Sequence, residues 1–197
     1  MYKEIYNTFA LDQASKLKRN IYKHLICIKS MPEFENVPYN EVKRRVNAVL
    51  DKFIQEKRLL LERDISERAL TGELVNYLKQ EFPLWDVDPE FNKMYSNGKN
   101  RPKTLTGRIA RTVSRDGHVT PDIIIHKNGP PPNPNLLVIL AKKESNTEDR
   151  EGEKDMQDLP DYISELGYKY GLFIQFKVKE NAGSRPTGKW FPSEENL

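Results

Sequence analysis

Two apolar segments of this chain are flanked by side chains that could act on a phosphate ester. Residues 121–125 begin with Pro121 and Asp122 and continue with three isoleucines, and Lys142 follows a second apolar run that begins at Asn135. A carboxylate can bind a divalent cation, which lowers the pKa of bound water and offsets charge on a phosphate. A lysine beside the cation can orient the attacking water. If these segments form neighbouring strands, their residues predict metal-assisted phosphodiester cleavage.

Position 140 does not suit this chemistry. Alternate residues of a strand face the same side, so a carboxylate two residues before Lys142 would point into the same site. The chain has Leu140 at that position, and a hydrocarbon side chain cannot bind a hard cation such as Mg²⁺. We therefore expect weak or absent catalysis unless another acid replaces this ligand.

Two further acids could serve such a site. Glu67 lies three residues before Leu70, on the apolar stripe of an expected helix over residues 64–80, which Asp64 or Ser66 could cap at its N-terminus. An acid favoured by the helix dipole in the first turn explains Glu67 equally well. Glu90 lies on the polar side of an expected strand over residues 85–94, and it is the candidate for a displaced metal ligand.

The elements that must position these residues are predicted by apolar spacing. The expected helices cover residues 8–29, 40–61, 64–80 and 149–166, and the expected strands cover residues 85–94, 121–126, 136–142 and 168–178. The last two strands are joined by a helix, which predicts a right-handed crossover between parallel strands.

Three regions are expected along the chain: an N-terminal helical hairpin over 1–63, a core over 64–180 and a C-terminal tail over 181–197 that is loose apart from Trp190-Phe191. Val42, Val46, Val49 and Phe53 keep near-heptad spacing on the second helix of the hairpin. That stripe could pack against the first helix or pair between subunits, and the intramolecular arrangement is favoured.

The element order resembles the PD-(D/E)XK nuclease superfamily, which includes restriction endonucleases and Holliday-junction resolvases. The resemblance covers roughly residues 64 to 178 and rests on Glu67, on Pro121-Asp122 and on Leu140-Ala141-Lys142. It implies an α/β fold with a restriction-endonuclease-like αβββαβ core, extended here by the N-terminal helical hairpin.

The resemblance also implies roles for individual residues and a Mg²⁺ or Mn²⁺ cofactor. Asp122 would be the central metal ligand and the carbonyl group of Ala141 a second. Glu67 would hold a metal-bound water or a second ion, and Lys142 would be the catalytic lysine.

The family has Glu, Asp or sometimes Gln at the position of Leu140. Three accounts of this departure stay open: an engineered replacement, a natural loss in a chain retained for binding, or a site completed by Glu90. The sequence does not choose among them.

Charge is unevenly distributed along this chain, whose net charge is only +3. Residues 99–118 contain six basic side chains and one acid, whereas residues 144–165 contain nine acids and two bases. The basic segment favours sequence-independent contacts with phosphates, although a solvated loop would have the same composition. The candidate nucleic-acid-binding residues are Lys99, Arg101, Lys103, Arg108, Arg111 and Arg115.

Composition excludes several classes of site. Cys27 is the only cysteine, which rules out an intrachain disulfide and a cysteine-based zinc site and is typical of a reducing cytoplasmic setting. No apolar run approaches the roughly 18 residues that a membrane-spanning helix needs, so no membrane partner is expected.

The expected function is metal-dependent DNA cleavage, impaired by Leu140, in a setting such as prokaryotic restriction, phage defence or DNA repair. DNA is favoured over RNA as the nucleic-acid partner. The alternatives are a non-catalytic nucleic-acid-binding module and a protein-interaction module on the same fold. Cutting both strands needs two active sites, which favours a homodimer or a partner subunit.

Overall fold

The computed structural model describes residues 37–91, 93–96, 99–102, 119–128, 135–146 and 151–192. All of them belong to one compact unit that begins at Val37. The expected helix over residues 8–29 lies outside the described residues. So do four of the candidate nucleic-acid-binding residues, and only the backbone of Lys99 and Arg101 is described.

A mixed sheet of five strands forms the centre of this unit, which confirms the α/β class. Across the sheet the strands are β1 (Asp86–Pro89), β4 (Ile123–His126), β5 (Asn135–Lys143), β6 (Tyr168–Phe176) and β7 (Thr187–Phe191). Only β5 and β6 pair in parallel, and helix α5 (Glu151–Leu166) connects them. The expected parallel pairing is therefore confirmed.

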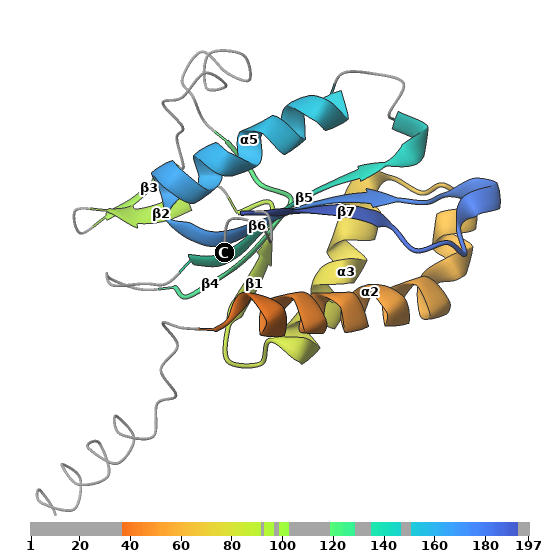
Figure 1. Ribbon diagram of the computed structural model, residues 1–197, viewed down its shortest axis with the longest axis horizontal. Helices are drawn as coiled ribbons and strands as arrows, with labels where there is room; N and C mark the ends of the chain where they lie inside the picture. The colour runs from red at the N-terminus through yellow and green to blue at the C-terminus, as the bar shows by residue number, and fades with distance from the viewer. Residues whose placement is uncertain are drawn as a thin grey trace, which may run out of the picture. The chain divides into compact units, whose positions relative to one another are not determined.

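Helices cover both faces of the sheet (Figure 1). Helix α5 lies on one face, and α2 (Tyr39–Glu62) and α3 (Glu67–Glu81) lie on the other. The Phe53 ring of α2 is 5.6 Å from the Tyr77 ring of α3 and 5.8 Å from the Phe176 ring of β6, measured between centroids. The stripe of Val42, Val46, Val49 and Phe53 is buried, and its aromatic member contacts both α3 and the sheet. The expected pairing of this stripe with the helix over residues 8–29 lies outside the described residues. Among the described residues, no helix is long and apolar enough to cross a membrane.

The start of α3 follows the sequence closely. The Ser66 hydroxyl accepts a hydrogen bond from the backbone N–H of Ala69 at 3.3 Å, so Ser66 is the N-terminal cap, as one of the two expected candidates. The other candidate, Asp64, lies in the preceding turn with φ of 49°. Its side chain is therefore available for contacts elsewhere.

The strand expected over residues 85–94 is shorter than predicted. β1 ends at Pro89, and Glu90 has a left-handed backbone with φ of 47°, which breaks the extended chain. The next residues of that range belong to β2 (Lys93–Ser96), which pairs with β3 (Lys99–Pro102) in a separate two-stranded hairpin. The alternating pattern thus covered two strands rather than one.

The C-terminal segment contains a strand where we expected a mostly loose tail over 181–197. β7 pairs with β6 in antiparallel register, with Trp190 opposite Leu172 and Phe191 opposite Gly171. The Trp190 ring also packs against Tyr39 of α2, with 5.6 Å between centroids. Trp190 and Phe191 thus attach β7 to the rest of the unit, although the other residues of the strand are polar or glycine.

Candidate active site

Asp122 is tied to the strand that carries Lys142. Asp122 immediately precedes β4, and its Oδ2 atom accepts a hydrogen bond from the backbone N–H of Ala141 at 2.7 Å. β4 and β5 are neighbours in the sheet, with Ile123 opposite Ile139. The pairing of these strands therefore brings the carboxylate within one residue of Lys142.

Glu67 reaches the same strand from the first turn of α3. Its Oε1 atom lies 3.3 Å from Nζ of Lys142, and its Oε2 atom accepts a hydrogen bond from the backbone N–H of Lys143 at 3.2 Å. The Glu67 and Lys142 side chains are only 21% and 22% exposed. The carboxylates of Glu67 and Asp122 contact the backbone of β5 on either side of Lys142, at Lys143 and Ala141. We call Glu67, Asp122 and Lys142 the active-site cluster.

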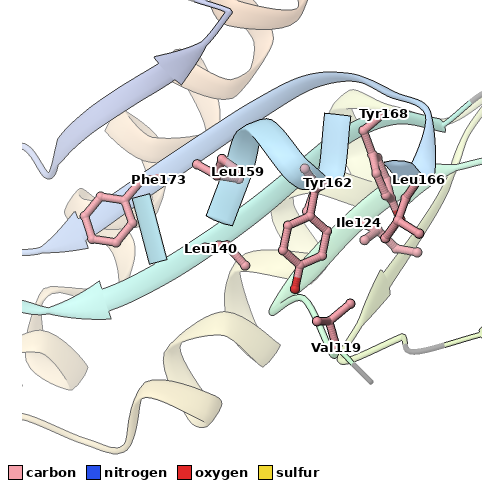
Figure 2. Close-up of a cluster of buried hydrophobic side chains, with 9 residues drawn as sticks. Val119, Ile124, Leu140, Leu159, Tyr162, Leu166, Tyr168 and Phe173 are labelled. Atoms are coloured by element: carbon pink, nitrogen blue, oxygen red, sulfur yellow. The ribbon is translucent and has the colours of Figure 1, made fainter. Parts of the chain in front are cut away.

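Leu140 is packed as a core residue. It is 6% exposed and faces α5, where its neighbours include Leu159 and Tyr162 (Figure 2). The same apolar cluster includes Phe173, which lies opposite Leu140 on β6. The leucine therefore fits its surroundings well, but it offers no oxygen to a cation.

Glu90 lies beside Asp122 through the backbone, while its carboxylate is engaged elsewhere. The Glu90 N–H donates a hydrogen bond to the Asp122 carbonyl group at 3.0 Å. The Glu90 Oε2 atom lies 2.9 Å from Nη2 of Arg68, on the first turn of α3. In this arrangement the Glu90 carboxylate pairs with a guanidinium group.

Asp64 and Lys143 form a second ion pair next to the cluster, which the sequence patterns did not predict. Nζ of Lys143 lies 2.8 Å from Oδ1 of Asp64, which also accepts from the Ser145 hydroxyl at 3.2 Å. Nζ of Lys179 lies 3.4 Å from Oδ2. The hydrogen bond from Lys143 holds the pKa of Asp64 below its ordinary value.

One signal in the sequence could have revealed this pair. Ile139, Ala141 and Lys143 are alternate residues of β5, so their side chains lie on the same face of the strand, and all three are buried. A lysine on the buried side of a strand needs a carboxylate partner, because an unpaired buried charge is costly. Asp64 was considered only as a helix cap, although α3 begins close to it.

The donor set is incomplete for the metal that the resemblance implies. Asp122, Glu67 and the Ala141 carbonyl group could supply oxygen ligands, but residue 140 supplies none. Within the described ranges, no three His, Cys, Asp or Glu side chains are grouped closely enough to hold a metal ion. The residues present therefore do not fit a complete Mg²⁺ site.

Comparisons with protein-family models, with curated proteins and with solved structures gave no match for this chain.

Proposed function

We propose that this chain is a PD-(D/E)XK-type DNA nuclease whose metal-dependent catalysis is impaired by Leu140. The observation that carries the proposal is the convergence of Glu67, Asp122 and Lys142 on one short segment of β5. An acid and a lysine beside a second acid are the groups that such chemistry requires. Their partial burial lets them interact with less screening by water than exposed charges have.

The elements around the cluster also support this proposal. Helix α3, strands β1, β4 and β5, helix α5 and strand β6 follow one another in the expected order, with the hairpin of β2 and β3 inserted. The cluster lies on β5 and at the starts of α3 and β4.

A non-catalytic DNA-binding module is the second candidate. The burial of Leu140 among apolar side chains of α5 and β6 favours it. A leucine that is well accommodated in the core carries no stability cost that would select for restoring an acid. In this case the same fold would bind DNA without cutting it.

Plasmid cleavage separates the two candidates. The chain and its Leu140→Glu variant are incubated with supercoiled DNA and Mg²⁺ or Mn²⁺, and parallel reactions contain EDTA. We expect Leu140→Glu to nick or linearise the plasmid only with metal, and the original chain to be much slower. Leu140→Met is the matched control, because it changes the same buried position without adding an oxygen ligand.

The catalytic residues are tested in the same background. Adding Asp122→Ala to Leu140→Glu should abolish cleavage if Asp122 belongs to the site. Equal cleavage by the chain and Leu140→Glu would place the active centre elsewhere and contradict the assigned role of Leu140. If neither protein cuts but both bind DNA, the non-catalytic module replaces the nuclease proposal.

A further inference from the structure

Arg68 and Glu90 form an ion pair, and each of them is next to a residue of the active-site cluster. Their closest nitrogen and oxygen atoms are 2.9 Å apart. Arg68 directly follows Glu67 on α3. Glu90 donates its backbone N–H to the carbonyl group of Asp122 at 3.0 Å. The pair is therefore positioned by the residues that the proposed function uses.

The pair is open to solvent, unlike the cluster itself. The Arg68 side chain is 81% exposed and the Glu90 side chain 40% exposed. An exposed ion pair contributes little to folding stability, because water screens it and both side chains lose rotamer freedom. Separating Arg68 from Glu90 therefore costs the fold little, and either side chain can change partners.

A phosphate group is a suitable partner for the exposed guanidinium group of Arg68. The guanidinium group has five N–H donors in a planar fork, which matches two oxygens of one phosphate. The Arg68 side chain is 81% exposed even though its Nη2 atom lies 2.9 Å from Glu90. A backbone phosphate that approaches the cluster would find most of this fork exposed.

The backbone of Glu90 holds its carboxylate in this position. Its φ of 47° is unusual for a residue other than glycine and costs conformational energy. The turn ends β1 directly beside Asp122, and the side chain meets Arg68 from there. The Glu90 carboxylate thus contacts the guanidinium as an anionic ligand would.

We propose that Arg68 binds a backbone phosphate of duplex DNA beside the active-site cluster, and that Glu90 competes with this phosphate for the guanidinium group. This inference rests on the proposed function, because it takes DNA as the ligand. Two anions that share one guanidinium group repel each other, so Glu90 must release Arg68 when DNA binds. Glu90 then weakens DNA binding, a role different from that of a displaced metal ligand.

Equilibrium DNA binding tests the roles of Arg68 and Glu90, because their substitutions should change the affinity in opposite directions. A short labelled DNA duplex is titrated by fluorescence anisotropy, in EDTA and over a range of salt concentrations. Arg68→Gln should weaken binding about tenfold, as expected for loss of a charge-assisted contact. It should also reduce the slope of log K against log salt by about 0.9, the value for one phosphate contact. Glu90→Gln should strengthen binding about threefold, and this gain should shrink in the Arg68→Gln background.

Arg185 provides a matched control. It is an exposed arginine paired with an acid, Asp51 of α2, at 3.3 Å, and both side chains are 54% exposed. Arg185→Gln removes the same charge and should have a smaller effect than Arg68→Gln. Equal effects of the two changes, weaker binding by Glu90→Gln, or no DNA binding by the original chain would each overturn the inference.

The outcome can be separated from that of the proposed function. If Leu140→Glu fails to cleave DNA but Arg68→Gln and Glu90→Gln shift binding as expected, the phosphate contact stands and the nuclease proposal falls. If Leu140→Glu cleaves DNA and Arg68→Gln leaves binding unchanged, the nuclease proposal stands and the role of Arg68 is rejected.

Discussion

The Asp122 carboxylate accepts a hydrogen bond from the backbone N–H of Ala141 at 2.7 Å. This bond joins the acid that precedes β4 to the strand that carries Lys142. It also gives Asp122 a structural role in the absence of metal. Loss of catalysis alone would therefore not remove every constraint on Asp122.

Asp122→Ala should destabilise the fold by about 1–3 kcal/mol, because it removes the charged acceptor of a partly buried hydrogen bond. Asp122→Asn keeps an oxygen acceptor and should cost less. Urea denaturation in EDTA measures both free energies of unfolding. Equal losses for the two variants would show that the bond to Ala141 does not stabilise the fold.

Asp64→Asn should change how stability depends on pH. Its pKa is lowered in the folded state, chiefly by the hydrogen bond from Lys143, so its ionised form stabilises the fold above the ordinary pKa of an aspartate. That contribution is lost as pH falls through the lowered pKa. We expect Asp64→Asn to cost about 2 kcal/mol at neutral pH and much less in acid below the lowered pKa, where the Asp64 carboxyl group is itself protonated.

Denaturation curves at the two pH values measure this difference. Asp51→Asn is the matched control, since its partner Arg185 and Asp51 itself are both half exposed. The control should be nearly neutral at both pH values. A loss for Asp64→Asn that is the same in acid and at neutral pH would contradict the assigned role of its charge.

Leu140→Ala should destabilise the fold by about 2–4 kcal/mol, because the leucine is buried against α5 and β6. Leu140→Glu should also be destabilising in EDTA, since it places a carboxylate beside the same apolar side chains. Mn²⁺ should recover part of the loss for Leu140→Glu and none for Leu140→Ala. Thermal denaturation with and without Mn²⁺ measures this contrast, and equal metal effects on the two variants would refute it.

Sequence patterns predicted the elements that have strong local signals. Ser66 before an apolar stripe gave the start of α3, and the apolar runs around residues 136–142 and 168–178 gave a parallel pair. The sequence also predicted that Glu67, Asp122 and Lys142 lie together. Hydrogen bonds from β5 to the two carboxylates bring these residues together.

The missed features depend on contacts between distant segments. β7 has a polar sequence and is held by Trp190 and Phe191 against residues far along the chain. The end of β1 depends on the left-handed backbone of Glu90, which alternation of polar and apolar residues does not reveal. The alternation of Lys143 with Ile139 and Ala141 could have indicated a buried lysine, but its partner Asp64 lies 79 positions away, so local spacing does not identify the partner.

Metal binding tests the central claim, that Leu140 stands where a nuclease of this type has a metal ligand. Isothermal titration calorimetry with Mn²⁺ is run on the original chain, on Leu140→Glu and on Leu140→Glu with Asp122→Asn. We predict binding by Leu140→Glu that is at least about tenfold tighter than by the original chain, and loss of this gain when Asp122 is also replaced. Equal Mn²⁺ affinity for the original chain and Leu140→Glu, with no effect of Asp122→Asn, would contradict the claim.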